Sequence, residues 1–453
     1  MKTVTHWIGG RPYGDGSSAS GTWAPVTDPA TGEVTTLVAM AGADEADAAV
    51  AAAKEAYATW RTSSLARRTA ILFRYRELLH ARRDDLAALI TAEQGKVHAD
   101  ALGEVARGLE IVELACGLGM ALKGDTSTEV SDGVDVVSVR RPLGVVVGIS
   151  PFNFPAMISM WMFPMAIACG NTFVHKPSSK APSASMLLAE LAAEAGVPDG
   201  VLNILHGDEI AVNALLDHPD VAAVSFVGST PVARHVYARA SAAGKRVQAL
   251  GGAKNHMLVL PDADLDAAAD AAVTAAYGSA GQRCMAVSVV VAVGSAGDAL
   301  VPRIAERATK VTIGPGDDPR SEMGPLVTRA HRDEVANHVA GAAAQGADVV
   351  LDGRDFTVAG LENGHWMGIS LLDRVGTDSD VYRNEIFGPV LCVVRAETYE
   401  EAMDIVNGSP FGNAASIFTR DGTDAGSGWA RLDRRSTRAK TLATACSAHL
   451  TPS

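Results

Sequence analysis

The sequence predicts an α/β protein made of two doubly wound parallel-sheet domains, with a β-ribbon as an added element. Beyond residue 140, short runs of β-branched and apolar residues alternate with helical segments, and Gly/Pro turns separate them. This alternation is typical of βαβ units, which build parallel sheets. The runs lie at residues 145–149, 172–175, 201–205, 222–227 and 257–260, and then at 287–293, 348–351 and 390–394. Two successive series of runs indicate two such sheets.

Length and composition are those of a folded multidomain protein. The chain has 453 residues, of which 47% are hydrophobic and 20% are charged. Disorder and a small disulfide-stapled fold are therefore excluded. The net charge of −13 argues against binding to nucleic-acid phosphates or to anionic membranes. We expect a cytoplasmic enzyme that acts on a small molecule, without nucleic-acid or membrane partners.

Targeting and membrane signals are weak. The first ten residues, MKTVTHWIGG, contain neither the apolar core nor the cleavage site of a secretory signal, so export is not expected. Residues 143–174 carry no charge and are long enough to span a bilayer. However, Pro151, Pro155 and Pro164 interrupt them, which favours a buried strand, a loop and a buried helix.

Helical periodicity dominates the first quarter of the chain. It covers residues 44–60, 65–90 behind Ser63 or Ser64 as a cap, and about 98–122. Alternating residues over 125–139 then indicate a β-ribbon, whose open edge would need a partner strand.

An anion-binding turn is present, although the usual GxGxxG fingerprint of dinucleotide folds is not. After the strand over 224–227 comes Gly228-Ser229-Thr230-Pro231, which suits the start of a helix. Such a helix start offers backbone N–H groups and a positive dipole to a pyrophosphate. An ordinary capped helix is the alternative interpretation.

Cys284 is the candidate nucleophile among five widely spaced cysteines that form no CxxC pair. That spacing indicates reduced thiols and no metal site. Arg283 precedes Cys284, and an adjacent cation can lower a thiol pKa and favour the nucleophilic thiolate. The alternative is a core cysteine, which is our interpretation of Cys116, Cys169 and Cys392 in their apolar surroundings.

Five ordered motifs resemble those of the aldehyde dehydrogenase superfamily. They are PFNFP (151–155), HKPS (175–178), FVGST (226–230), GQRC (281–284) and EIFGP (385–389). Within the superfamily, WMFPMAIACGNTF, LGGAKNH and GQRCMA resemble the methylmalonate-semialdehyde dehydrogenase branch. The resemblance implies oxidation of malonate or methylmalonate semialdehyde with NAD and coenzyme A to acetyl- or propionyl-coenzyme A.

The resemblance also implies roles for individual residues. Cys284 would attack the aldehyde carbon, while the Asn153 amide and the Cys284 backbone N–H would stabilise the oxyanion. Arg107 and Arg283 would grip the substrate carboxylate, because the planar guanidinium binds carboxylates bidentately. The implied cofactor-binding set is Phe152, Lys176, Ser179, Gly228, Ser229, Glu385 and Phe387. Without the resemblance, the alternative interpretation of Arg107 is an arginine on the surface of a helix.

Two departures from related sequences bear on the reaction. Hydrolytic relatives carry a glutamate before the LGG-type turn, whereas residues 245–261 contain no carboxylate and Gln248, Ala249 and Leu250 cover the equivalent positions. Without a general base, attack by water should be slow, which favours acyl transfer to the thiol of coenzyme A. At Ser179, many NAD-using relatives carry a glutamate that repels a 2′-phosphate, so NADP is an alternative to NAD.

The expected domain organisation follows from the motifs. A dinucleotide-binding domain would cover 1–124 and 142–250, the ribbon 125–141 and a catalytic domain 251–422. Residues 423–453 match nothing in the family and are rich in Gly, Ser, Thr and Arg, so we expect a tail with little structure. The resemblance implies a homo-oligomer. A hydrolytic NAD(P)-dependent enzyme that releases free acid and an inactive family member are the alternative functions.

Overall fold

The computed structural model describes residues 1–14, 21–431 and 440–445. They divide into two compact units, and the main division falls between Gly251 and Gly252. Two short segments upstream, 29–33 and 95–97, group with the second unit rather than with the first. The sequence pattern did not predict that these two segments belong to the second unit.

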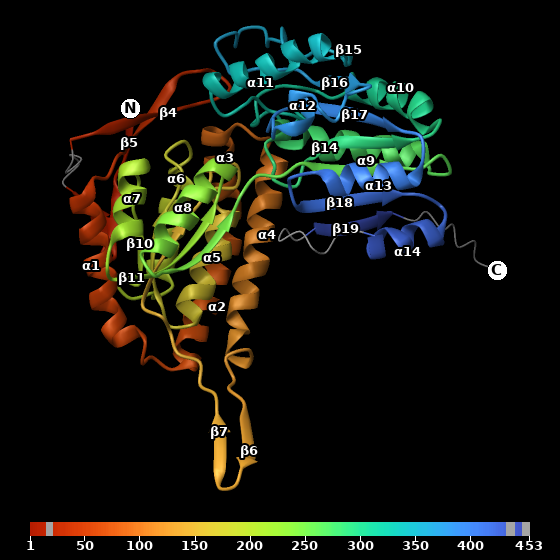
Figure 1. Ribbon diagram of the computed structural model, residues 1–453. Helices are drawn as coiled ribbons and strands as arrows, with labels where there is room; N and C mark the ends of the chain where they lie inside the picture. The colour runs from red at the N-terminus through yellow and green to blue at the C-terminus, as the bar shows by residue number, and fades with distance from the viewer. Residues whose placement is uncertain (15–20, 432–439, 446–453) are drawn as a thin grey trace. The chain divides into compact units, whose positions relative to one another are not determined.

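The first unit is built on a seven-stranded sheet of order β12-β11-β8-β9-β10-β2-β3 (Figure 1). The strands from β12 to β10 are parallel, and β2 and β3 add an antiparallel edge. The strands are β2 (His6–Ile8), β3 (Arg11–Tyr13), β8 (Val145–Ile149), β9 (Thr172–Lys176), β10 (Leu202–Ile204), β11 (Val221–Val227) and β12 (Arg246–Leu250). The predicted parallel sheet is therefore confirmed.

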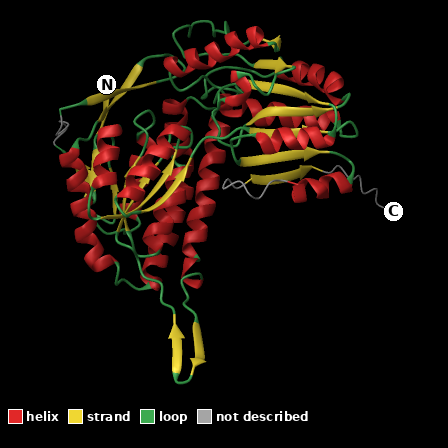
Figure 2. Cartoon of the chain, in the orientation of Figure 1, coloured by secondary structure: helices red, strands yellow, loops and turns green. Residues whose placement is uncertain are grey.

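Two smaller sheets complete the strands of this unit. The sequence pattern missed the first, which has the order β1-β5-β4 and consists of β1 (Lys2–Val4), β4 (Trp23–Thr27) and β5 (Val34–Ala39). The second is the predicted ribbon, formed by β6 (Thr126–Ser131) and β7 (Val134–Val137), and it projects from the unit (Figure 2).

Helices cover both faces of the seven-stranded sheet. One apolar core contains residues of α1, α7 and α8, and the other contains residues of α2 to α6. Strand β8 is buried along its whole length, with Val145 and Val147 in one core and Val146 in the other. Burial on two faces explains the continuous apolar runs in the sequence. The helices are α1 (Ala43–Trp60), α2 (Leu65–Ala81), α3 (Arg83–Gln94), α4 (His98–Cys116), α5 (Met157–Ala168), α6 (Ser183–Glu194), α7 (Glu209–Asp217) and α8 (Thr230–Ala242), with the 3₁₀ turn η1 (Leu118–Met120).

The helix predicted over 65–90 is in fact two helices. The Ser64 side chain caps α2 by accepting a hydrogen bond from the backbone N–H of Arg67 at 3.2 Å. Arg82 then leaves the helical conformation, with φ −106° and ψ 17°, and α3 begins at the next residue. Periodicity alone did not reveal this break, because the apolar spacing resumes beyond it.

The second unit contains another seven-stranded sheet, of order β15-β16-β17-β14-β13-β18-β19. It is parallel except for the antiparallel edge strand β15, and one continuous apolar core surrounds it. Its strands are β13 (Asn255–Val259), β14 (Val287–Val293), β15 (Asp348–Leu351), β16 (Ser370–Asp373), β17 (Val390–Ala396), β18 (Asn413–Phe418) and β19 (Lys440–Ala445). Its helices are α9 (Leu265–Tyr277), α10 (Ala296–Ala308), α11 (Arg329–Ala342), α12 (Asp380–Arg383), α13 (Tyr399–Gly408) and α14 (Gly422–Arg431), with 3₁₀ turns η2 (Gly278–Gly281) and η3 (Ala343–Gln345).

The expectation of a tail with little structure over 423–453 is wrong for the part that the structure describes. Helix α14 follows β18, and β19 pairs with β18 in parallel register from Asn413–Lys440 to Phe418–Ala445. An open sheet edge accepts a strand through backbone hydrogen bonds, so a polar composition does not prevent pairing. The rest of the predicted tail, 432–439 and 446–453, lies outside the described residues.

Within the described ranges, no helix is long and apolar enough to cross a membrane. The uncharged stretch over 143–174 forms β8, a loop, the 12-residue helix α5 and the first residues of β9. The predicted strand, loop and buried helix are confirmed.

Candidate active site

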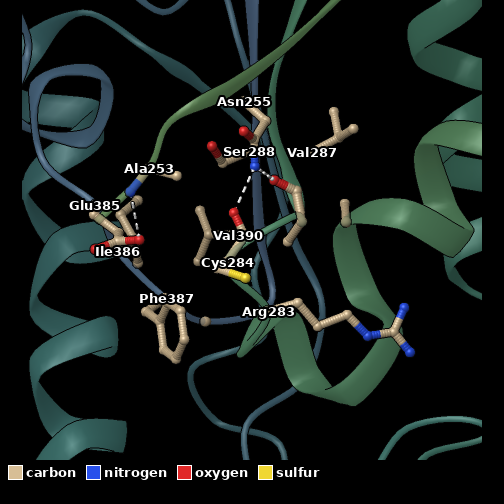
Figure 3. A pocket seen from close by; sticks show the side chains of 14 residues that line it. Ala253, Asn255, Arg283, Cys284, Val287, Ser288, Glu385, Ile386, Phe387 and Val390 are labelled. Carbon is tan, nitrogen blue, oxygen red and sulfur yellow. Dashed lines mark hydrogen bonds between the residues drawn. The ribbon is translucent and has the colours of Figure 1, made fainter. Parts of the chain in front are cut away.

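A pocket in the second unit surrounds Cys284, at the amino ends of its central parallel strands. Most of its lining comes from segments that lead into β13, β14 and β17, and Ala276 of the helix over 265–277 completes it (Figure 3). These segments contribute Ala253 and Asn255, then Arg283 and Cys284, and then Glu385 to Phe387. Because parallel neighbouring strands begin at the same edge of a sheet, motifs that lie far apart in the sequence meet here.

The loop before Cys284 has an unusual backbone conformation. Ser279, Ala280 and Gly281 have φ values of 51°, 53° and 70°. For a non-glycine residue this left-handed conformation costs on the order of 1–2 kcal/mol, and such strain is concentrated at functional sites. At Gly281 a Cβ atom would lie 2.1 Å from the carbonyl oxygen of Gly388, so only glycine fits between the two loops.

The Cys284 side chain is half-buried, and its electrostatic surroundings differ from the expectation. Burial raises the pKa of the thiol, and the negative charge of Glu385 raises it further. The backbone N–H groups of Cys284 and Met285 oppose this pKa shift, because they donate toward the sulfur. The net shift is upward, and Arg283 is not among the causes that lower this pKa.

Arg283 extends away from Cys284 in the pocket (Figure 3). Its Nε donates a hydrogen bond to the Ser279 hydroxyl at 3.2 Å, and its guanidinium occupies the space beside Gly278. The guanidinium of Arg283 is therefore directed away from the thiol of Cys284, although the two residues are neighbours in the sequence.

Glu385 and Phe387 line the same pocket. Glu385 accepts a hydrogen bond from the Ala253 backbone N–H at 2.9 Å, and burial raises the pKa of its carboxyl group. Phe387 has a φ of 58°, and the His331 ring forms a 2.8 Å hydrogen bond with its carbonyl oxygen. Both predicted residues are thus held in defined positions.

Lys254 is a supporting residue that the sequence reasoning did not single out. Its buried ammonium donates hydrogen bonds of 2.6 Å to the carbonyl oxygen of Val381 and 2.7 Å to that of Asn384. It therefore fixes the chain immediately before Glu385. The signal was available, because Lys254 belongs to the quoted motif LGGAKNH, but a lone lysine gives no indication of its partner.

The predicted residues of the first unit lie at the carboxyl ends of the parallel strands of its sheet, whereas the Cys284 pocket lies at the amino ends of strands in the second unit. Asn153 is buried in the loop after β8, Lys176 ends β9, and Gly228 follows β11. The Lys176 ammonium donates a 3.2 Å hydrogen bond to the Gly207 carbonyl oxygen, and burial lowers its pKa to about 8. In open α/β sheets, ligands bind outside this edge of the sheet.

The predicted pyrophosphate turn forms as a helix start. Ser229 is the N-cap residue of α8, with Pro231 in the first turn, and its side chain makes no capping bond to any described residue. At Gly228, a Cβ atom would lie 2.5 Å from the tip of the Phe226 ring, so a larger residue would require this ring to move. The backbone N–H groups of this turn fit a phosphate group.

The other predicted residues occupy more exposed positions. The Lys180 ammonium lies over the Phe152 ring, 4.9 Å from the ring centroid. Ser179, which precedes Lys180 in the chain, is half-buried. Arg107, on α4, forms an ion pair with Glu110 at 3.0 Å, and 70% of the Arg107 side chain is exposed.

Metal chemistry and disulfides receive no support from the described residues. Over residues 1–14, 21–431 and 440–445, no group of three or more potential metal-ligating side chains occurs. Among the described cysteines, Cys116, Cys169, Cys284 and Cys392 are free thiols. Cys446 lies outside the described residues.

A profile of the Aldehyde dehydrogenase family matches residues 16–434. The chain belongs to this family. It is 49% identical to a malonate-semialdehyde dehydrogenase of Pseudomonas aeruginosa, over 93% of this chain and 84% of that protein. It is 46% identical to an acylating mitochondrial methylmalonate-semialdehyde/malonate-semialdehyde dehydrogenase of Homo sapiens, over 94% of this chain and 79% of that protein.

Solved structures agree with these sequence relatives. A methylmalonate-semialdehyde dehydrogenase of Oceanimonas doudoroffii superposes with a TM-score of 0.93 at 47% identity, covering 95% of this chain and 88% of that chain. A Sinorhizobium meliloti structure, described as such a dehydrogenase complexed with NAD, has the same TM-score and coverage at 45% identity. The resemblance predicted from the motifs is therefore confirmed for the family, its fold and its semialdehyde dehydrogenase relatives.

Proposed function

We propose that this aldehyde dehydrogenase oxidises malonate or methylmalonate semialdehyde with NAD and coenzyme A, and forms acetyl- or propionyl-coenzyme A. The relatives named above support the substrate class and the acyl transfer. The observation that carries the choice of acyl acceptor is the lack of a carboxylate over residues 245–261. In this segment Gln248, Ala249 and Leu250, at the end of β12, cover the positions where a hydrolytic relative would carry its general base.

The proposed chemistry begins at Cys284. The thiolate attacks the aldehyde carbon, and the Asn153 amide and the Cys284 backbone N–H stabilise the resulting oxyanion. When bound, NAD accepts the hydride that leaves this carbon. The acyl group then remains on Cys284 as a thioester. The substrate carboxylate leaves as carbon dioxide, and the carbon that carried it takes up a proton. The thiol of coenzyme A then takes the shortened acyl group, and its proton returns to the Cys284 sulfur. The loss of one carbon accounts for the two-carbon acetyl product of a three-carbon semialdehyde.

The residues of the first unit fit a dinucleotide. The uncapped start of α8 after Gly228 suits a pyrophosphate, and the buried Lys176 suits a ribose hydroxyl next to it. Phe152 and Ser179 belong to the same proposed set, and Glu385 and Phe387 would hold the nicotinamide ribose and ring. We choose NAD over NADP, although Ser179 cannot repel a 2′-phosphate. Comparing kcat/KM for the two cofactors tests this choice.

A second candidate is hydrolysis to the free acid, which the position of Glu385 favours. Its carboxylate lines the pocket with Cys284 and has a raised pKa, which are properties of a general base. Against this role, the carboxylate already accepts the hydrogen bond from Ala253. If Glu385 were the base, replacing it by Gln would abolish release of free acid from the acyl-enzyme.

The deciding experiment measures NADH and acyl product from malonate semialdehyde, with and without coenzyme A. We expect a single turnover of NADH without coenzyme A, and multiple turnovers with acetyl-coenzyme A as product when it is added. Cys284→Ala is the control for thiol-dependent turnover. Undiminished turnover to free acid in the complete absence of coenzyme A would refute acyl transfer, and absence of NADH under both conditions would refute the dehydrogenase activity.

We also propose that the protein is a homo-oligomer that uses the ribbon β6–β7. Val130, Val134 and Val136 on this ribbon are each about half exposed, at 53%, 47% and 51%. Exposed apolar side chains on a two-stranded ribbon with open edges favour pairing with another strand. Light scattering coupled to size exclusion tests the proposal, and a monomer at micromolar concentration would contradict it.

A further inference from the structure

Two asparagine side chains converge on the backbone carbonyl oxygen of Cys284. Asn255 donates to it at 2.9 Å and Asn413 at 2.8 Å, so amide N–H groups from two strands occupy both lone pairs of one oxygen. Asn255 begins β13 and Asn413 begins β18, and these strands are parallel neighbours. The sequence reasoning assigned no role to either residue.

Asn255 is fully engaged in holding this part of the pocket. Its second amide N–H donates to the Ala286 carbonyl oxygen at 2.8 Å, and its own oxygen accepts the Ala414 backbone N–H at 3.0 Å. Figure 3 shows the two bonds that this amide donates toward the Cys284 loop. The side chain is 3% exposed, so water cannot easily replace these bonds.

Asn413 holds its amide in place at a conformational cost. Its φ is 92°, in a region that few side chains other than asparagine and aspartate tolerate. Non-glycine residues in this conformation persist where the surrounding structure fixes them, and functional sites are where they cluster. The bond to Cys284 is a specific reason for this residue type at the start of β18.

The carbonyl oxygen of Cys284 and the N–H of Met285 belong to one peptide group, which is planar and trans. Fixing the oxygen therefore fixes the direction of that N–H. The Met285 N–H is one of the two backbone groups that donate toward the Cys284 sulfur. A physical connection thus runs from the two asparagine amides, through one rigid peptide, to the reactive atom.

We propose that Asn255 and Asn413 are positioning residues, which clamp the Cys284 carbonyl oxygen and thereby keep the Met285 N–H directed at the Cys284 sulfur. The clamp stabilises negative charge on that sulfur. The described charged groups that line the pocket with the sulfur are Glu385, which opposes the thiolate, and Arg283, which turns away from it. Among the described groups, the backbone N–H groups of Cys284 and Met285 are the ones that favour the thiolate.

The inference rests on the proposed function in taking Cys284 as the nucleophile, but its test needs neither aldehyde nor cofactor. The measurement is the rate of alkylation of Cys284 by iodoacetamide from pH 6 to 10, followed by mass spectrometry of the peptide that contains it. Asn413→Gly removes one donor and tolerates the positive φ. Asn255→Ala removes the other donor together with the bonds to Ala286 and Ala414.

The expected result is a pH profile displaced to higher pH in both variants, with a limiting rate at high pH close to that of the parent. At neutral pH the rate should fall about tenfold, which corresponds to weakening one hydrogen bond to a charged group. In the semialdehyde assay the same variants should lower kcat with little change in KM.

Asn203→Ala is the matched control. Asn203 is a buried asparagine of the first unit whose amide donates to the Gly200 carbonyl oxygen at 2.8 Å and whose oxygen accepts the Gly9 N–H at 3.0 Å. It should lower stability without moving the alkylation profile. Folded Asn413→Gly with the parent profile, or an unchanged midpoint with a lower limiting rate, would overturn the proposal. If Asn255→Ala does not fold, Asn413→Gly decides alone.

Discussion

Replacing Arg107 by Ala tests the substrate class most directly, because Arg107 is expected to bind the substrate carboxylate. In the structure its guanidinium pairs with Glu110, with 3.0 and 3.1 Å between Nη1 and the two carboxylate oxygens. The two side chains are 70% and 57% exposed. An exposed pair of this kind stabilises a helix by at most about 1 kcal/mol, so Arg107 can exchange Glu110 for a substrate at little cost.

The magnitude follows from the difference between these two interactions. A charge-assisted hydrogen bond to a substrate carboxylate contributes about 1.5–3 kcal/mol to binding. Arg107 must leave Glu110 to make this bond, which costs about 0.5 kcal/mol in the parent and nothing in the variant. The net loss of about 1–2.5 kcal/mol predicts that Arg107→Ala lowers kcat/KM for semialdehyde acids by about 5- to 70-fold. Neutral aldehydes of similar length should lose less than about twofold.

The assay compares kcat/KM for malonate semialdehyde and propanal in the parent and in three variants. Glu110→Gln, which frees Arg107 from its partner, should leave or raise kcat/KM for the acid. Arg76→Ala is the matched control, because Arg76 is another helix arginine of the same unit that pairs with a glutamate, Glu113, at 2.9 Å. Equal losses on the acid and on the neutral aldehyde would refute the role of Arg107 in binding the carboxylate.

Three further predictions concern the pocket and the first unit. Because the negative charge of Glu385 raises the thiol pKa, Glu385→Gln should move the alkylation profile of Cys284 to lower pH, and an unmoved profile would contradict the electrostatic account. Gly281→Ala should destabilise the second unit by more than Gly346→Ala does. Gly346 is the control because its φ is 88° but no described atom lies within 4 Å of its Cβ position. Gly346→Ala should lower the free energy of unfolding in urea by about 1 kcal/mol. An equal decrease in both variants would show that the chain near Gly388 moves easily to accept the added Cβ atom. Burial raises the pKa of Glu93 from 4.5 to about 7, so its contribution to stability should fall as the pH rises from about 4.5 to 7, by at most about 3 kcal/mol. Glu93→Gln should therefore be more destabilising at pH 5 than at pH 8, and an equal effect at both values would show that Glu93 ionises normally.

The sequence was informative where a property is local. Strand β8 and strand β14 were predicted with their observed bounds, because burial on both faces leaves an uninterrupted apolar run. Residue type likewise predicted a cap at Ser63 or Ser64, and the structure shows that Ser64 is the cap. The break at Arg82 was not, since the residues on both sides of it favour a helix and packing decides where the helix ends.

The tail shows the opposite kind of error. Its composition predicts little structure, yet residues 440–445 form a strand on the edge of β18. Backbone hydrogen bonds to an open edge do not depend on side-chain type, so composition is a poor guide to such a strand.

What the sequence by itself determined is the family and the doubly wound fold, because apolar runs and short motifs record these locally, and it predicts Cys284 as the nucleophile. The tertiary structure alone decided the electrostatics and the support of that nucleophile. Arg283 is next to Cys284 in the chain but turns away from it, whereas Asn413 lies 129 positions away and bonds directly to its carbonyl oxygen. The reason is physical: a parallel sheet brings the amino ends of distant strands to one edge, and contacts made there leave no spacing pattern in the sequence.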